Sequence, residues 1–329
     1  MPLSLLVKES SPMTTTGTVN QTGAFDDAGQ LGTVLQDERA EDTLTLSSAD
    51  DAKAIVEAFR SSGATGPWTN VDRTAYADRL AAVLADPRVI TQGALNLCGP
   101  AAFFNIVAGR HPVAVAQGAA ALYESGKCDI GGLHIEAKSD LLAADYTAMV
   151  AAIQAKSDVV APPADYVLLG ALRNATNPFW QPDWKGNPDQ ELAGMTRPEE
   201  LAAWFRATGF FATVTDGGKW ATNPGIPSAM NLSCAAGTDN ALLVNANVLA
   251  SVGLTGVDNS FILRSFPNHW VVLRTEIIVD VTPAADGTPV IDTGIWTWGA
   301  SSLGLKFPQQ LFADNYYGAV TTVLPSQGG

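Results

Sequence analysis

The sequence predicts an α+β fold, in which a helical part is followed by an antiparallel β-sheet. In the first two thirds of the chain, apolar residues recur at helical spacing. In the last third, short runs of β-branched and aromatic residues are bounded by Gly, Pro, Asn and Asp. Helices and strands that are segregated in this way favour α+β over alternating α/β. We expect a polar N-terminal arm over residues 1–50 and one domain over 51–329, with its helical part at 51–209 and its β part at 210–325.

The expected helices follow one another from residue 48. Ser48 opens an acidic first turn before the run AKAIVEAFR, and Arg73–Ala85 has an amphipathic pattern. The next helix starts at Cys98 or Gly99, carries a proline in its first turn, and stops at Gly109. Further helices are expected over 112–125, over 139–157 and from a Thr196 cap to Gly209. The proline-punctuated stretch 162–188 between the last two is interpreted as a long connection.

The expected strands are five runs rich in β-branched and aromatic residues, at 241–252, 260–266, 269–281, 289–300 and 316–324. Residues 285–288, with the sequence ADGT, have the composition of a hairpin turn between two of these runs. This order predicts a sheet of neighbouring antiparallel strands.

Composition and charge exclude several classes of protein. Of the 329 residues 47% are hydrophobic, so wholesale disorder is excluded. Lys plus Arg number 19 against 33 Asp plus Glu, and the net charge of -14 argues against nucleic acid or an anionic membrane as a partner. No apolar run reaches the ~18 residues of a membrane span. The N-terminus lacks a basic segment followed by an apolar one, so we expect a protein that is cytoplasmic as made, with any export by a leaderless route.

Cofactor and metal motifs are missing from the sequence. The three cysteines and three histidines show no CxxC and no zinc-ligand spacing. GxGxxG after a strand, GxxxxGK[ST], HExxH and GxSxG do not occur. We therefore expect no metal and no cofactor.

The segment Gln92-Gly-Ala-Leu-Asn-Leu-Cys98-Gly-Pro has the features of a nucleophile site. A cysteine at a helix N-terminus lies near unpaired N–H groups and the positive end of the helix dipole, and both favour the thiolate. Gly99 would let a substrate approach the backbone. The Cys98 N–H and the side-chain amide of Gln92 could then donate to an oxyanion. The alternative is a buried cysteine that only begins a core helix.

A nucleophilic cysteine needs a base, and the chain offers three histidines. His111 follows the far end of the Cys98 helix, about 15 Å from the thiol. His134 lies in a glycine-flanked segment, whereas His269 opens the strand-like run HWVVL. A rigid strand can hold an imidazole to hydrogen-bond accuracy, which favours His269. The alternative for His269 is a structural histidine at a sheet edge.

Gln92, the Cys-Gly-Pro-Ala run and the distant HWVV run together resemble the papain-like cysteine peptidase superfamily. The closest likeness is to bacterial members with a Cys-Gly-Pro motif, such as the bacteriocin-processing peptidases. The resemblance covers residues 92–104 and 268–299 and implies Gln92 as oxyanion donor, Cys98 as nucleophile and His269 as base. It also implies a helical lobe with the cysteine, a β-sheet lobe with the histidine, and a site between them.

The chain departs from the family pattern at the residue that orients the histidine. Where the family has Asn or Asp, this sequence has Trp296, and an indole cannot accept a hydrogen bond from imidazole. Asp292 on the same run is the expected substitute, with Thr297 or Asp280 as alternatives. Strand alternation puts Asp292 and Thr297 on opposite faces, so both can face His269 only across a bulge.

The resemblance implies a thiol-dependent hydrolase that cleaves an amide bond of a protein or peptide. Bacterial proteins with papain-like folds of this kind are often toxins or exported effectors. A peptidoglycan-directed or housekeeping amidase is the second enzyme hypothesis. Deamidation or acyl transfer would use the same thioester. The hypothesis from another class is a non-catalytic binding protein that retains the fold, which Trp296 and the polar arm suggest.

Overall fold

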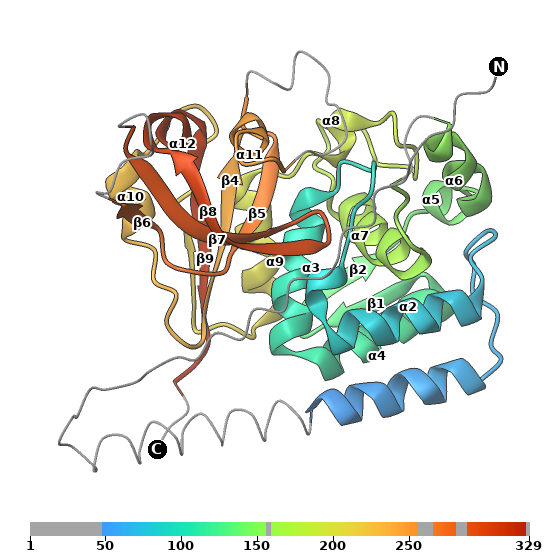
Figure 1. Ribbon diagram of the computed structural model, residues 1–329. Coiled ribbons are helices and arrows are strands. Elements are labelled where there is room, and N and C mark those ends of the chain that lie inside the picture. Colours follow the sequence, from blue (N-terminus) through green and yellow to red (C-terminus); the bar gives the residue numbers. More distant parts are fainter. Residues whose placement is uncertain (1–47, 156–158, 255–265, 281–287, 327–329) are drawn as a thin grey trace, which may run out of the picture. The chain divides into compact units, whose positions relative to one another are not determined.

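The computed structural model describes residues 48–155, 159–254, 266–280 and 288–326. Contacts divide the chain into the units Met1–Leu44 and Thr45–Gly329, and every described residue belongs to the second. The fold of this unit is α+β, as predicted: most of its helices gather beside the large sheet, a few short helices cover the sheet, and a small β-hairpin lies among the helices (Figure 1). Residues 1–47 of the expected polar arm lie outside the described residues. Residues 260–265 of the expected strand at 260–266 and residues 285–287 of the expected turn at 285–288 also lie outside the described residues.

Four helices begin where the sequence predicts them. The chain is helical over 48–61, and the next helices are α2 (Arg73–Ala85), α3 (Cys98–Arg110) and α4 (Pro112–Ser125), with the short 3-10 turn η1 (Pro87–Val89) between α2 and α3. α3 continues past the expected stop at Gly109 to Arg110. Its last hydrogen bond runs from the His111 N–H to the Val107 carbonyl, at 2.7 Å.

The single helix expected over 139–157 is two helices, α5 (Ser139–Leu142) and α6 (Tyr146–Gln154). Asp145 causes the second start, because its carboxylate accepts hydrogen bonds from the N–H groups of Thr147 and Ala148. The expected last residues, 156 and 157, lie outside the described residues.

The proline-rich stretch after residue 162 contains a helix that the sequence analysis did not predict. α7 (Pro163–Thr176) starts with Pro163 in its first turn, where the missing N–H of proline has no cost, and most of it is buried. α8 (Glu191–Gly194) and α9 (Pro198–Thr208) follow. The cap of α9 is Arg197 instead of the expected Thr196, and Glu200 accepts a hydrogen bond from the Arg197 N–H at 2.8 Å.

The β part is one curled antiparallel sheet. Its strands follow the order β3 (Thr213–Asp216), β9 (Tyr316–Val323), β4 (Thr238–Val244), β5 (His269–Leu273), β7 (Val290–Thr297) and β6 (Ile278–Asp280), and β8 (Ala300–Pro308) also pairs with β7. The expected strand at 241–252 is β4 followed by α11 (Asn247–Ala250), and that at 269–281 is β5 and β6. β3, β8 and a separate hairpin of β1 (Lys127–Ile130) and β2 (Leu133–Glu136) were not predicted.

Both faces of the central strands are buried. Leu243, Trp270 and Val272 pack with the helices in the larger core. Their sequence neighbours on β4 and β5 belong to a second core, under α10 (Ile226–Met230), α11 and α12 (Gln309–Asn315). Burial on both faces explains why HWVVL is continuously apolar after its histidine. α3 packs against β5, and this contact joins the helical part to the sheet (Figure 1).

Candidate active site

A tight loop, residues 92–97, leads the chain into α3 and shapes one side of the site. Gly93 and Asn96 have left-handed backbones, with φ of 54° and 55°. A Cβ on Gly93 would lie 2.6 Å from the Ala161 nitrogen, so only glycine lets the loop pack this closely against the chain before α7. The Leu95 N–H donates to the Gln92 carbonyl at 3.2 Å and closes the turn.

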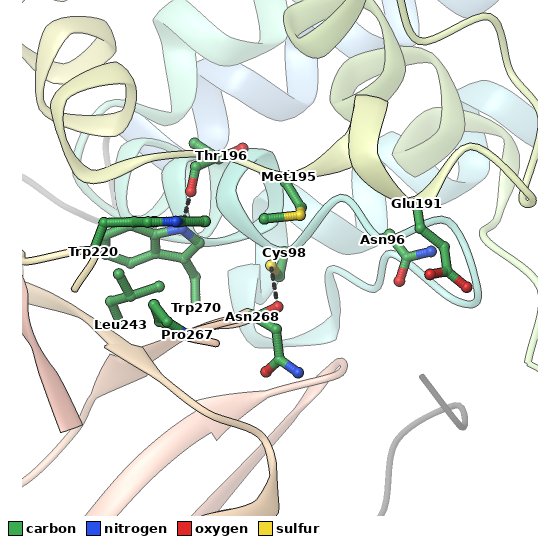
Figure 2. Close-up of a pocket in the computed structure, with 10 residues that line it drawn as sticks. All are labelled: Asn96, Cys98, Glu191, Met195, Thr196, Trp220, Leu243, Pro267, Asn268 and Trp270. Atoms are coloured by element: carbon green, nitrogen blue, oxygen red, sulfur yellow. Dashed lines mark hydrogen bonds between the residues drawn. The ribbon is translucent and has the colours of Figure 1, made fainter. Parts of the chain in front are cut away.

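Cys98 is the first residue of α3, and the backbone amides of Trp270, Gly99 and Cys98 lie close enough to its sulfur to act against the raised pKa of the thiol. The first hydrogen bond of the helix runs from the Ala101 N–H to the Leu97 carbonyl, and Pro100 has no N–H. The amides of Cys98 and Gly99 therefore remain available at the helix N-terminus. The side chain is buried, and its Sγ lies 3.8 Å from the Asn268 carbonyl oxygen, which is 170 residues away in the chain (Figure 2).

Three of the four predicted site residues are brought together. Gln92, Cys98 and His269 line two cavities in common, and Trp298 lines both as well. Gln92 is buried, and its Oε1 has no hydrogen-bond partner among the described residues. A buried amide oxygen without a partner costs free energy, and such an acceptor recurs where a ligand or substrate donates the missing hydrogen bond.

His269 is held by a hydroxyl and by an aromatic ring. Its Nε2 lies 2.6 Å from the Oγ1 of Thr297, and its ring stacks on Trp298 with 4.5 Å between centroids. Trp298 and Gly299 form the two-residue turn between β7 and β8, and both have positive φ, 47° and 83°. Such a turn matches the twist of a hairpin. It also places the indole against the imidazole.

Asp292 is not at this site, which corrects the expectation that it orients His269. β5 pairs with β7 at Trp296, and Asp292 lies four residues farther along β7, about 13 Å of strand. There Asp292 pairs across the sheet with Lys306, whose Nζ is 4.0 Å from Asp292 and 3.0 Å from Asp280. Of the three residues considered as orienters, only Thr297 contacts the imidazole. The Trp296 indole donates to the Arg88 carbonyl at 2.7 Å.

Burial keeps both the thiol and the imidazole neutral. It raises the pKa of Cys98 to about 11, although the nearby N–H groups and the Arg173 guanidinium act in the opposite direction. It lowers the pKa of His269 to about 3. Among the described residues, no carboxylate acts on the imidazole to offset its desolvation. At neutral pH the pair is therefore a thiol and a neutral imidazole.

Asp165 supports the site, although the sequence analysis did not single it out. Its buried carboxylate pairs with Arg79 at 2.6 Å and accepts a hydrogen bond from the Thr91 N–H, also at 2.6 Å. This anchors the backbone one residue before Gln92. Burial raises the pKa of Asp165 and the Arg79 guanidinium lowers it. The signal in the sequence was an aspartate inside an apolar run, in the stretch interpreted as a connection.

Gly99 has a different neighbour from the one expected. A Cβ on Gly99 would overlap the side chain of Thr196, which packs against the first turn of α3. The close approach that requires glycine here is therefore made by the chain itself. The Thr196 carbonyl also accepts a hydrogen bond from the Trp270 indole at 2.8 Å, so Thr196 links the Cys98 helix to β5 (Figure 2).

The other histidines and cysteines lie elsewhere. His111 stacks on Phe210, with 4.1 Å between ring centroids, and His134 is an exposed residue of β2 whose Nδ1 lies 2.8 Å from Asp129. Cys128 is buried and Cys234 half-buried, and neither lines the cavities at Cys98. Within the described ranges, no group of His, Cys, Asp and Glu is placed to hold a metal, and no helix has the length and apolar composition to cross a membrane.

Comparison with models of known families, with curated proteins and with solved structures finds no match to this chain. The resemblance to papain-like peptidases therefore depends on the residues around Gln92, Cys98 and His269 themselves.

Proposed function

We propose that the protein is a papain-like, thiol-dependent hydrolase that acts on an amide bond of a protein or peptide. One observation carries this proposal: a cysteine at a helix N-terminus, a histidine at the start of a strand and a buried glutamine amide line the same cavities. These are the three kinds of group that amide attack requires, namely nucleophile, base and oxyanion donor.

The chemistry starts from a neutral pair. With its Nε2 bonded to Thr297, His269 has Nδ1 left as the nitrogen that can take the Cys98 proton. The sulfur then bonds to the amide carbon, and the oxyanion receives hydrogen bonds from the Cys98 N–H and the Gln92 side chain. The imidazolium returns its proton to the departing amine as the C–N bond breaks, which leaves a thioester. Water then releases the acid, or an amine takes the acyl group.

His269 acts in this scheme as a general base during attack, because burial disfavours a thiolate–imidazolium pair before substrate binds. Arg173 and the amides at the start of α3 stabilise the negative charge as it forms on sulfur.

An electrophilic peptide probe tests the proposal, for example a set of peptidyl fluoromethyl ketones followed by intact mass. We expect one adduct, on Cys98, which is lost in Cys98→Ala and at least 100-fold slower in His269→Ala. Cys128→Ala and His134→Ala are matched controls and should label at the rate of the parent protein. Labelling of Cys98 that does not depend on His269 would exclude the proposed base.

A non-catalytic binding protein is the second candidate, and the burial of the pair favours it: Cys98 and His269 expose only 7% and 4% of their surface. Peptide turnover separates the two candidates, because the resting Cys98 is a thiol with a pKa of about 11 in both and its alkylation rate does not distinguish them. A binding protein hydrolyses no peptide. An enzyme shows turnover that disappears in Cys98→Ala.

A further inference from the structure

A cavity passes beside Cys98 and has two walls of different chemistry. On one side of the sulfur its lining is apolar, formed by Trp220, Leu243 and Trp270. On the other side lie Asn96 and Glu191 (Figure 2). A chain laid across the sulfur would therefore meet an apolar surface on one side and a polar, acidic one on the other.

The Glu191 carboxylate pairs with no cation among the residues that the structure describes. It is the first residue of α8, it is half-buried, and within the described ranges no basic side chain pairs with it. Nearby acids behave differently: Glu199 pairs with Arg197 at 2.7 Å, and Glu200 pairs with Arg173 at 3.1 Å. A partly desolvated carboxylate without a partner is a site for a cationic group supplied by a ligand.

A second polar group in the same cavity lacks a partner. The Thr196 side chain is 2% exposed, and its Oγ1 makes no hydrogen bond with any described residue. The hydroxyl packs against the first turn of α3 at Gly99, so Thr196 contributes to the shape of this wall. Cys98 lines the same cavity.

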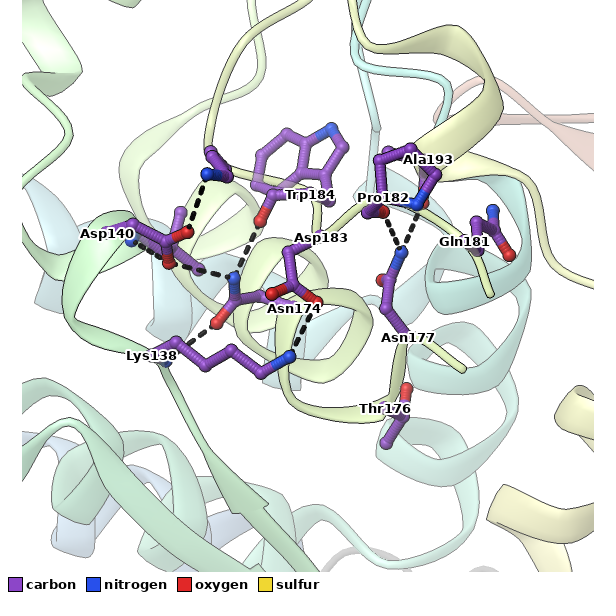
Figure 3. Close-up of polar contacts among 12 residues, drawn as sticks. Lys138, Asp140, Asn174, Thr176, Asn177, Gln181, Pro182, Asp183, Trp184 and Ala193 are labelled. Atoms are coloured by element: carbon purple, nitrogen blue, oxygen red, sulfur yellow. Dashed lines mark hydrogen bonds and ion pairs between the residues drawn. The ribbon is translucent and has the colours of Figure 1, made fainter. Parts of the chain in front are cut away.

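The wall that carries Glu191 and Thr196 is firmly attached to α7. The buried Arg173 guanidinium donates to the Ala193 carbonyl at 2.8 Å and to the Gln181 side chain at 2.7 Å. The Asn177 side-chain amide donates to the carbonyls of Pro182 and Ala193 at 2.6 and 3.2 Å, so the segment before α8 is tied to α8 itself (Figure 3). A fixed wall can discriminate between ligands by charge, because it does not move to pair Glu191 elsewhere.

We propose that this cavity selects a basic polypeptide segment, with a lysine or arginine bound by Glu191 and an apolar side chain against Trp220 and Leu243. The inference rests on the proposed function, for which it names the class of substrate. The net charge of -14 supports it, since an acidic protein attracts a basic partner and repels an acidic one.

The test measures binding, so that it does not depend on turnover. Cys98→Ala protein is titrated into fluorescein-labelled heptapeptides, and anisotropy gives the affinity. Each peptide has one leucine and one variable residue, Lys, Gln or Glu, one to three positions to either side of it. Glu191→Gln is compared with Glu199→Gln, which removes the same charge from the exposed surface eight residues away.

We expect the best lysine peptide to bind at least tenfold more tightly than its glutamine counterpart, since charge-assisted pairs contribute at this level. Glu191→Gln should abolish the difference, Glu191→Lys should reverse it in favour of the glutamate peptide, and Glu199→Gln should retain it. Equal binding of lysine and glutamine peptides, no binding of any peptide, or a preference that survives Glu191→Gln would overturn the inference. Charge-selective binding without hydrolysis by the Cys98 protein would overturn the proposed function and leave this inference standing.

Discussion

The imidazole of His269 is bonded to a neutral hydroxyl, that of Thr297, with 2.6 Å between Nε2 and Oγ1. A hydroxyl can fix the tautomer by accepting the Nε2–H, but it carries no charge with which to stabilise an imidazolium. This distinguishes the site from one in which a carboxylate orients the base. It also accounts for the lowered pKa of His269, because the hydroxyl carries no negative charge that would offset the effect of burial.

Thr297→Val should separate orientation from packing, because valine keeps the shape of threonine and removes the acceptor. The buried Nε2–H would lose its partner, which costs about 1–3 kcal/mol in stability. We expect the rate of Cys98 labelling by the peptide probe to fall about tenfold or more, while Thr297→Ser retains most of it. Equal rates in Thr297→Val and the parent would show that the hydroxyl does not orient the base.

The neutral His269 also makes the stability of the fold depend on pH. Its pKa is about 3 in the folded protein and 6.5 when exposed, so between these values the unfolded chain binds more protons. The contribution of the neutral imidazole to the free energy of unfolding is complete above pH 6.5. It is lost as pH falls towards 3, by about 1.4 kcal/mol per pH unit. Urea unfolding at pH 7 and 4.5 should show the parent losing about 3 kcal/mol more than His269→Gln.

His134→Gln is the control for that measurement. Asp129 raises the pKa of the exposed His134, so its contribution has the opposite sign: it is present below 6.5 and lost as pH rises through the folded-state pKa. Removing His134 should therefore not reduce the loss of stability in acid. If His269→Gln and the parent lost the same stability between pH 7 and 4.5, the imidazole would not be held neutral by burial.

Local patterns were sufficient to predict the elements that carry the site. Pro100 in the first turn marks the start of α3 at Cys98, and HWVVL reads as β5 because both faces of that strand are buried. The same approach missed α7, where Pro163 was interpreted as a break although it occupies the first turn of a helix. A proline alone does not distinguish the start of a helix from its interruption, and the apolar run that follows it was the stronger signal.

The orienting residue could not be predicted from spacing alone. Alternation along β7 placed Asp292 and Thr297 on opposite faces, but the choice between them depends on which residue of β7 lies opposite the start of β5. That register is a long-range property, set where Val272 pairs with Trp296. The packing of Thr196 on Gly99 also joins residues far apart in the sequence, and the residues next to Gly99 do not predict it.

Gln92 should act on the transition state more than on binding. Its side chain is buried and lines the same cavities as Cys98, where its Nε2 group could donate to an oxyanion. Gln92→Ala should lower kcat for a peptide substrate by about 100-fold and leave KM nearly unchanged, as expected for a lost oxyanion donor. Asn96→Ala, in the same loop, is the control and should alter KM more than kcat. A Gln92→Ala defect confined to KM would assign the residue to substrate binding.

Gly99→Ala should disturb the junction between α3 and the wall that carries Thr196. The added Cβ would overlap the Thr196 side chain, and overpacking of this kind costs about 1–3 kcal/mol. Because Thr196 also bonds Trp270 through its carbonyl, the displacement should reach β5 and slow labelling of Cys98 as well. Thr196→Gly in the same chain removes the overlapping atoms and should recover part of both losses, measured by urea unfolding and by the peptide probe. Gly109→Ala is the matched control: an added Cβ there meets only the Pro87 ring, at 3.8 Å, so it should be neutral or stabilising in the helix. If Gly99→Ala were as stable and as reactive as Gly109→Ala, the contact with Thr196 would not be what requires glycine after Cys98.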